Sequence, residues 1–275
     1  GSFASHVIGY IGRINDRDLE RIEESDDAAN YRGTDHIGKS GLEKSYERDL
    51  HGITGFEEVE VDSGGRAVRL LRRTPAIPGN NVVLTLDLKL QEIVEKAFGN
   101  RRGALVAIEP STGGILAMVS TPTFDPNLFV DGIRSEDWDQ LNNSPDRPMI
   151  NRAINGAYPP GSTFKLVQGL IGLQEGVLRP SDLHVCHEGY QAGRRRMKCH
   201  SHASPLDLRF AVATSCNAYF CYVFRDILDN PKYGNVKEGY DAWKEYVESF
   251  GFGRKLGSDF LDERDGYVPD RGWYD

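Results

Sequence analysis

The chain has 275 residues and a net charge of −8; 39% of its residues are hydrophobic and 27% are charged. These values are ordinary for a globular protein with one large domain or two smaller ones. The negative charge argues against nucleic acid and anionic membrane surfaces as main partners. We find no signal peptide and no apolar run near the roughly 20 residues of a membrane span. Gly1 and Ser2 resemble a cloning remnant, so the question of an anchor stays open.

The first part of the chain is charged and rich in glycine, and it holds short segments of β character. We expect one strand at residues 6–12 and another at residues 56–62, where apolar and acidic residues alternate. Residues 63–73 then predict a turn and a return strand. This part is therefore expected to be β-rich.

Residues 74–81 are rich in Pro, Gly and Asn and predict a domain boundary. We accordingly divide the chain into an N-terminal part, residues 1–78, and a second domain, residues 79–275. The second domain is expected to begin with a strand at 82–86. A helix should follow, capped by Asp87 and ended by Gly99.

The remainder of the second domain mixes antiparallel strands with helices. Residues 103–120 form two apolar runs around Pro-Ser-Thr-Gly-Gly, which predicts a hairpin. Helices are expected at 207–229 and 240–250. Because the helices are largely separated from the antiparallel strands along the chain, we predict the α+β class.

A Pro-Pro-Gly break precedes Ser162 and Lys165, which stand at the start of an apolar helical segment. Residues i and i+3 share a helix face, so the Lys165 amine can take the proton of the Ser162 hydroxyl. The helix start would stabilise developing negative charge, with the Ser162 N–H as half of an oxyanion hole. The plainer alternative is a chance motif in which Ser162 only caps the helix.

A second polar element, TSCNAYF at 214–220, places Ser215 and Asn217 about 50 residues after Ser162. Ser-x-x-Lys, a Ser-Asp-Asn type triplet and Lys-Thr-Gly form the active-site set of penicillin-binding proteins and class A β-lactamases. In that scheme Ser215 relays protons between Lys165 and the leaving group, and Asn217 binds the substrate amide. The alternative is a polar turn before a helix.

The chain resembles the class B penicillin-binding proteins, and among them the elongation-type penicillin-binding protein 2 group. The segments that carry the resemblance occur in family order over nearly the whole chain: HVIGYIGRIN, NYRGTDHIGKSGLEKSYE, HGITGFEEVEV, GALVAIEPSTGGILAMVSTPTFDPN, NRAINGAYPPGSTFK and SCNAYF. The resemblance implies an N-terminal pedestal followed by a serine transpeptidase domain of the β-lactamase-like fold.

The resemblance also implies a peptidoglycan D,D-transpeptidase of cell-wall elongation that needs no cofactor for its chemistry. Ser162 would be acylated by the D-Ala-D-Ala end of a stem peptide and would pass the acyl group to an amine on a neighbouring strand. β-Lactams would trap the acyl-enzyme. The N-terminal part would contact membrane proteins of the elongation complex, at the periplasmic face of the bacterial inner membrane.

Two departures from the family pattern suggest a chain truncated at its C-terminus, and Gly1-Ser2 suggests truncation at the N-terminus as well. No Lys-Thr/Ser-Gly triplet follows Asn217, and Lys39-Ser40-Gly41 lies far upstream, where we interpret it as a turn. The chain also stops at Asp275, where the family continues. Whether this piece turns over substrate is therefore left open.

Cysteines and histidines cluster between residues 184 and 221. Cys186, Cys199, His202 and Cys216 make a plausible tetrahedral zinc set, and the resembled group has a metal site beside this motif. With four protein ligands, such a zinc would be structural. A Cys186–Cys199 disulfide or unpaired thiols are the alternatives. Cys221 is expected in the core.

Two other functions share the first two motifs or the fold. A serine β-lactamase or D,D-carboxypeptidase would need a deacylating base, for which Glu263 is the nearby candidate. A non-catalytic β-lactam sensor or scaffold is the other alternative. The Arg194–Arg196 run is expected at a solvated loop tip, where it could meet an anionic substrate.

Overall fold

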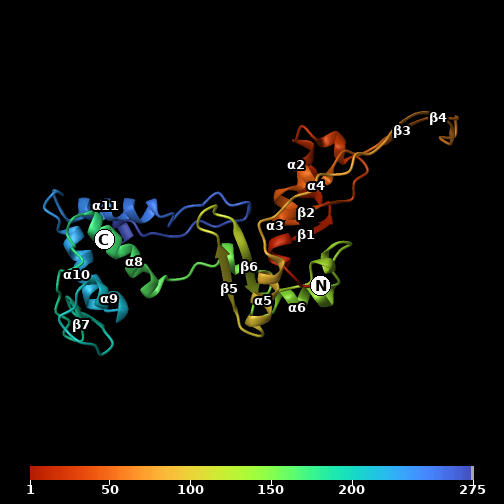
Figure 1. Ribbon diagram of the computed structural model, residues 1–275. Helices are drawn as coiled ribbons and strands as arrows, with labels where there is room; N and C mark the ends of the chain where they lie inside the picture. The colour runs from red at the N-terminus through yellow and green to blue at the C-terminus, as the bar shows by residue number, and fades with distance from the viewer. Residues whose placement is uncertain (274–275) are drawn as a thin grey trace. The chain divides into compact units, whose positions relative to one another are not determined.

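The computed structural model describes residues 1–273 of the chain. They divide into two compact units. The first unit holds Gly1–Gly156 and Gly257–Arg264, and the second holds Ala157–Leu256 and the chain from Asp265 onward. Helices and antiparallel two-stranded sheets make up the described residues (Figure 1), so the predicted α+β class is confirmed. Within residues 1–273, none of the helices combines the length and apolar character that crossing a membrane requires.

The first unit contains three antiparallel strand pairs among several short helices. Its helices are α1 (Ser5–Ile8), α2 (Asp16–Glu23), η1 (Ala28–Tyr31), α3 (Gly41–Ser45), α4 (Glu47–His51), α5 (Leu88–Phe98), η2 (Pro126–Phe129), α6 (Ser135–Asn142) and α7 (Arg152–Asn155). Its strands are β1 (Tyr10–Arg13), β2 (His36–Ser40), β3 (Phe56–Val61), β4 (Ala67–Thr74), β5 (Gly103–Ile108) and β6 (Ile115–Thr121). The pairs are β1–β2, β3–β4 and β5–β6.

Strands β3 and β4 form the hairpin expected at residues 56–73, and in Figure 1 it projects as a ribbon from α2 and α4. The strand expected at residues 6–12 is wrong in its first half. Ser5–Ile8 is the short helix α1, and the strand begins at Tyr10. Gly9 separates the two with φ of 81°, a conformation that favours glycine, so the chain changes structure there.

The helix capped by Asp87 and the hairpin at 103–120 are confirmed. The Asp87 carboxylate accepts hydrogen bonds from the N–H groups of Lys89 and Leu90, and the helix ends before Gly99. The strand expected at 82–86 is wrong. Thr85 contacts strand β6 through its side-chain hydroxyl rather than through a backbone ladder.

The second unit contains the predicted Ser-x-x-Lys and Ser-x-Asn segments. Its elements are η3 (Gly161–Thr163), α8 (Phe164–Gln174), β7 (Gly189–Ala192), β8 (Arg195–Lys198), α9 (Leu208–Ala213), α10 (Asn217–Leu228), α11 (Val236–Ser249) and η4 (Arg271–Trp273). Helices α8, α10 and α11 lie together (Figure 1), and their apolar side chains form one core. Tyr219, Val223 and Ile227 of α10 recur at helical spacing and are almost completely buried there.

Two helices replace the single helix expected at 207–229, because the chain leaves helical geometry at Thr214–Cys216. Asp207 caps α9, and the thiol of Cys216 accepts a hydrogen bond from the Tyr219 N–H at the start of α10. The second expected helix begins earlier than predicted, at Val236, where Asn235 is the cap. The break between α9 and α10 places Ser215 in the turn that joins the two helices.

Candidate active site and metal centre

Ser162 lies in a short 3-10 turn, η3, that leads directly into helix α8. The turn starts at Gly161, whose φ of 58° favours glycine. Ser162 is exposed, whereas Lys165 in the first turn of α8 is half-buried. The side chain of Ser162 does not cap either helical segment, since the capping positions belong to Pro160 and Thr163. The plainer alternative of a helix N-cap is therefore wrong.

The hydroxyls of Ser162 and Ser215 and the amine of Lys165 form a closed triangle. The Lys165 Nζ lies 3.2 Å from the Ser162 Oγ and 2.9 Å from the Ser215 Oγ. The two hydroxyl oxygens lie 3.0 Å apart, within hydrogen-bond distance. The Lys165 amine also donates to the Ser215 carbonyl at 2.6 Å. A proton can therefore pass between any two of these three side chains.

Ser215 reaches the triangle through a left-handed backbone turn. Its φ is 53°, which is unfavourable for a residue with a Cβ atom. The N–H groups of Ser215 and Cys216 donate to the carbonyls of Val212 and Ala211, so the turn is fastened to α9. Strain held by surrounding structure in this way is typical of functional sites.

Asn217 begins helix α10 and is tied to the end of strand β8. Its Nδ2 donates to the Lys198 carbonyl at 2.8 Å. Its Oδ1 has no hydrogen-bond partner within residues 1–273. The amide is therefore oriented by the protein while its oxygen stays available to accept a hydrogen bond.

The environment of Lys165 favours the neutral amine. Burial lowers the pKa of Lys165 below the ordinary value of 10.5, and negative charge on Cys199, Cys216 or Cys221, when they are thiolates, opposes this shift. A lysine with a lowered pKa is a better proton acceptor near neutral pH. This is the property that an activated serine requires from its base.

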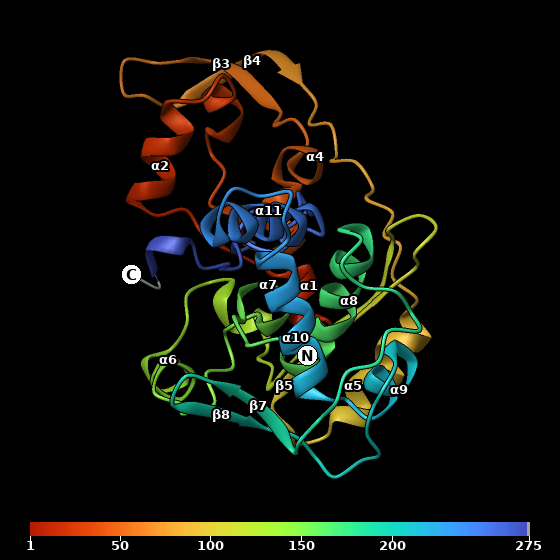
Figure 2. The same ribbon diagram turned by 90° about the vertical axis from the view of Figure 1, so that its left-hand side faces the viewer.

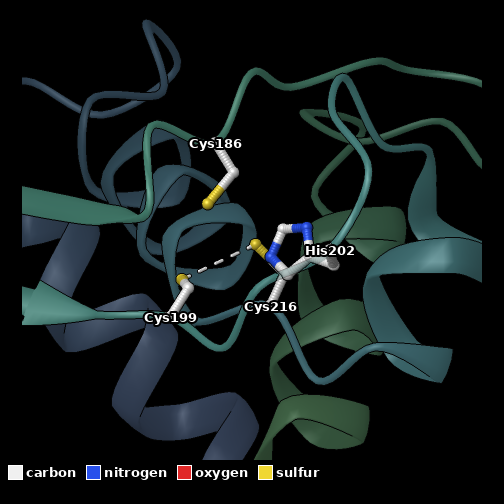
Figure 3. A group of neighbouring side chains, drawn as sticks. All are labelled: Cys186, Cys199, His202 and Cys216. Carbon is white, nitrogen blue, oxygen red and sulfur yellow. Dashed lines mark hydrogen bonds between the residues drawn. The ribbon is translucent and has the colours of Figure 1, made fainter.

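The predicted metal ligands also meet in the second unit. Figure 3 shows the side chains of Cys186, Cys199, His202 and Cys216 pointing toward one another. One ligand atom from each residue lies within 4.8 Å of every other. The sulfur atoms of Cys199 and Cys216 are 3.9 Å apart, and all four cysteines of the chain are free. Two sulfurs about 2.3 Å from one tetrahedral zinc would lie about 3.8 Å apart, so the spacing fits.

His202 has one ring nitrogen, the Nε2, that is free to bind a metal ion together with the thiols. The Nδ1 of His202 lies 2.9 Å from the Ala203 carbonyl, to which it can donate, and this leaves the Nε2 as a lone-pair donor. That buried Nε2 has no hydrogen-bond partner in the part of the chain that the structure describes. A buried nitrogen without a partner is costly, and a metal ion would satisfy it.

The start of helix α10 directs N–H groups at two of the sulfurs. The Ala218 N–H donates to the Cys199 Sγ at 3.2 Å, and the Tyr219 N–H donates to the Cys216 Sγ at 3.4 Å. Burial alone would raise the pKa of Cys199, but the Ala218 N–H helps to lower it overall. Burial raises the pKa of Cys216 to about 12, so this thiol would need a cation to lose its proton.

The comparisons with known proteins agree with this geometry. The Penicillin binding protein transpeptidase domain profile matches residues 103–275, and the Penicillin-binding Protein dimerisation domain profile matches residues 1–84. The chain belongs to the penicillin-binding protein transpeptidase family.

Curated members of the family resemble the chain over almost its whole length. Peptidoglycan D,D-transpeptidase MrdA of Escherichia coli K12 is 41% identical over 99% of this chain and 42% of its own length. The Haemophilus influenzae protein of the same name is 38% identical over 99% of this chain and 41% of its own length. The chain thus spans less than half of the length of these relatives.

Solved structures of penicillin-binding proteins share the fold. Pseudomonas aeruginosa PBP2, in complex with WCK 5153, is 36% identical with a TM-score of 0.79, over 99% of this chain and 54% of that one. PBP2 of Helicobacter pylori, in complex with MreC, is 28% identical with a TM-score of 0.83, over 99% of this chain and 48% of that one. The predicted resemblance to the penicillin-binding protein 2 group is confirmed.

Other residues singled out in the sequence lie outside the two clusters of this penicillin-binding protein. Glu263 belongs to the first unit, where it accepts a hydrogen bond from the Ser258 hydroxyl at 2.9 Å. In the same unit, Lys39-Ser40-Gly41 joins the end of β2 to the start of α3. Cys221 is half-buried and contacts Met197, with 3.7 Å between the two sulfur atoms.

Sequence reasoning missed the backbone groups that complete the site. The Lys198 carbonyl orients Asn217, and the Ala218 N–H stabilises the Cys199 sulfur. It also missed Phe220, whose ring centre lies 6.0 Å from the Lys165 amine. No residue type signals a backbone group, and the single helix expected at 207–229 gave no sign of the free N–H groups at the start of α10.

Proposed function

We propose that this chain is part of a peptidoglycan D,D-transpeptidase of cell-wall elongation, with Ser162 as the nucleophile and Lys165 as its base. The observation that carries the proposal is the closed triangle of Ser162, Lys165 and Ser215. Family membership and the 41% identity to a relative named as such a transpeptidase support it.

In the proposed acylation step, the Ser162 Oγ attacks the carbonyl carbon between the two terminal D-Ala residues of a stem peptide. Neutral Lys165 takes the hydroxyl proton as the new C–O bond forms. The C–N bond then breaks, and the proton passes through the Ser215 hydroxyl to the leaving amine of D-Ala. Asn217 accepts a hydrogen bond from a substrate N–H at its free Oδ1.

In the second step, an amine on a neighbouring stem peptide attacks the acyl carbon, and the Ser162 Oγ leaves and regains a proton. β-Lactams would acylate Ser162 in the same way, and the resulting acyl-enzyme would hydrolyse slowly. The Lys-Thr/Ser-Gly triplet of the family does not occur between Asn217 and Asp275. The chain spans less than half of its curated relatives, and activity is proposed for the whole protein rather than for this stretch alone.

The cluster of Cys186, Cys199, His202 and Cys216 is proposed to hold a structural zinc ion. A zinc ion bound by these four side chains would cross-link the segments that carry them. It would have no open coordination position for water. The residues themselves connect the loop after Leu183 and the end of β8 to the start of α10. Since Ser215 precedes Cys216 directly, the cluster would hold Ser215 in its left-handed turn.

Residues 1–78 are proposed to be a separate pedestal domain, with the transpeptidase domain from residue 79. The family profiles matching residues 1–84 and 103–275 support this division. We further propose that the pedestal contacts membrane proteins of the elongation complex at the periplasmic face of the inner membrane. The complex of a similar PBP2 with MreC supports this partner class.

A peptide-transfer assay tests the proposed function. The full-length protein is incubated with a D-Ala-D-Ala donor peptide and an amine acceptor, and the products are identified by mass spectrometry. Cross-linked product that is lost in Ser162→Ala is the expected result. Hydrolysed donor without cross-links would indicate a D,D-carboxypeptidase, and rapid penicillin hydrolysis a β-lactamase. A stable penicillin adduct without peptide products would indicate a sensor.

A further inference from the structure

A positively charged hairpin, made of β7, β8 and the turn between them, lies beside the proposed active site. Gln191 pairs with Arg196, and Ala192 pairs with Arg195, around a tight turn at Gly193 and Arg194. Figure 2 shows this hairpin as a two-stranded ribbon. Among the residues that the structure describes, no third strand pairs with it. No further strand therefore occupies either outer edge, and on the β8 edge the Lys198 carbonyl is the group bonded to Asn217.

The charge of the hairpin contrasts with that of the whole chain. The chain has a net charge of −8, yet four of the five charged residues between 184 and 204 are basic: Arg194, Arg195, Arg196 and Lys198. All four are exposed. None of them forms an ion pair within residues 1–273. Four unpaired cations on one exposed hairpin create a local positive potential that attracts anionic groups.

The strand direction separates these side chains onto two faces. Met197 contacts Cys221 of α10, so Met197 points toward that helix. Side chains alternate along a strand, so Arg196 and Lys198 point to the opposite face. The guanidinium of Arg196 donates one hydrogen bond to the His187 carbonyl, which orients it while leaving further N–H groups free.

The same alternation applies to the backbone of β8. Cys199 donates its N–H to the Glu188 carbonyl, which marks that pair as hydrogen-bonded. Bonded and non-bonded pairs alternate in an antiparallel hairpin, so Lys198 and Arg196 direct their N–H and C=O groups outward. The Lys198 carbonyl confirms this pattern, because it accepts the hydrogen bond from Asn217 outside the hairpin.

Short contacts connect this open edge to the proposed nucleophile. Lys198 contacts Asn217 at 2.8 Å, and Ser215, two residues before Asn217, lies 3.0 Å from Ser162. A peptide paired with this edge would thus run past Lys198 toward the turn that carries Ser215. Extended peptides bind exposed strand edges by backbone hydrogen bonds, and side chains on the strand then select among them.

We propose that the outer edge of β8, with Arg194, Arg195 and Arg196, is a positioning subsite for an extended, carboxylate-bearing peptidoglycan stem peptide. The backbone of β8 would hold the peptide as an added strand, and the arginines would bind its free carboxylates. This inference rests on the proposed function and assigns a substrate-positioning role to the hairpin. It does not place the arginines in the chemical step.

Peptide binding to the full-length protein tests the subsite. A fluorescent peptide ending in D-Ala-D-Ala, with free side-chain carboxylates, is compared with a copy whose side-chain carboxylates are amidated. Both are titrated into Ser162→Ala protein, with and without Arg194→Gln, Arg195→Gln and Arg196→Gln. The matched control is Arg209→Gln, an exposed arginine on α9. Replacement of the three arginines by lysine provides the conservative variant.

We expect the three glutamine substitutions to lower the affinity for the free-carboxylate peptide by about tenfold. The reason is that each exposed ion pair raises the affinity by a factor of about two to five. The amidated peptide should bind equally to both proteins. The lysine variant should recover most of the affinity, and Arg209→Gln should change nothing. Equal affinities for the two peptides, or no measurable binding to the intact hairpin, would overturn the inference.

Penicillin acylation separates a binding role from a structural one. In protein with Ser162 intact, the three glutamine substitutions should leave the rate of labelling by a fluorescent penicillin unchanged. A parallel loss of penicillin labelling would show that the hairpin only supports the fold, and would overturn the inference. If penicillin fails to label the unsubstituted protein, the proposed function fails, whereas charge-dependent peptide binding would still support the subsite.

Discussion

The amine of Lys165 lies 3.2 Å from the hydroxyl of Ser162, and it lies closer still, at 2.9 Å, to the hydroxyl of Ser215. The first distance follows from the i, i+3 spacing at the start of α8. The second depends on the left-handed turn that carries Ser215 from α9 to α10. One lysine can therefore serve both the attacking serine and the serine that passes the proton onward.

The pKa of Lys165 gives a pH prediction. The neutral amine is the active base, and burial lowers the pKa of Lys165 from 10.5. The rate of Ser162 acylation by a β-lactam should therefore rise with pH, with an inflection below 10.5. Lys165→Ala should reduce the rate by about 10²–10⁴-fold and remove the inflection. Stopped-flow labelling from pH 6 to 10 measures both; an unchanged profile in Lys165→Ala would contradict the assignment.

Two substitutions at Ser215 separate its hydroxyl from its backbone strain. Ser215→Ala and Ser215→Gly should both slow acylation by about 10²-fold, because both remove the proton relay. The glycine variant should be about 1 kcal/mol more stable than the alanine variant, since glycine tolerates a φ of 53°. Urea denaturation measures the stability difference. Acylation at the normal rate in either variant would exclude Ser215 as the relay.

Removal of the proposed zinc ion should destabilise the second unit. A tightly bound ion at a thousand times its Kd contributes about 4 kcal/mol, so a chelator should lower the Tm by about 8–16 °C. Cys199→Ser should lose the bound metal, whereas Cys221→Ser, outside the cluster, should retain it. Native mass spectrometry measures the metal directly. A mass two hydrogens lighter and without metal would instead indicate a disulfide.

Two glycines of α8 should respond differently to alanine. A Cβ at Gly172 would lie 2.7 Å from a methyl carbon of buried Val223 on α10, whereas a Cβ at Gly169 would meet its neighbours at an ordinary 3.6 Å. Gly172→Ala should cost about 1–3 kcal/mol of unfolding free energy through overpacking. Gly169→Ala should be neutral or stabilising by up to about 1 kcal/mol. Equal stabilities by denaturant unfolding would contradict the close approach of α8 and α10.

The sequence predicted those parts of the site that local spacing determines. Ser162 and Lys165 meet because they are one helical turn apart, and Asp87 caps α5 because its carboxylate reaches the first N–H groups. The grouping of Cys186, Cys199, His202 and Cys216 followed from residue type together with the family resemblance, and the structure brings them together.

The errors concern backbone geometry that tertiary contacts decide. Residues 207–229 have continuous helical character, yet the turn at Ser215 divides them, and nothing in a serine predicts a positive φ. Residues 82–86 have the composition of a strand, but Thr85 bonds through its side chain instead of the backbone. The roles of the Lys198 carbonyl and the Ala218 N–H also had no residue-type signal.

Intact-mass spectrometry of the full-length protein after incubation with a penicillin tests the central claim most directly, with wild type beside Ser162→Ala and Ser249→Ala. Ser249 is a matched control, because it lies at the end of α11 and its hydroxyl bonds only to Tyr246 among the described residues. We predict one covalent adduct in the wild type and in Ser249→Ala, and none in Ser162→Ala. An adduct that persists in Ser162→Ala, or its absence from the wild type, would contradict the claim that Ser162 is an activated nucleophile.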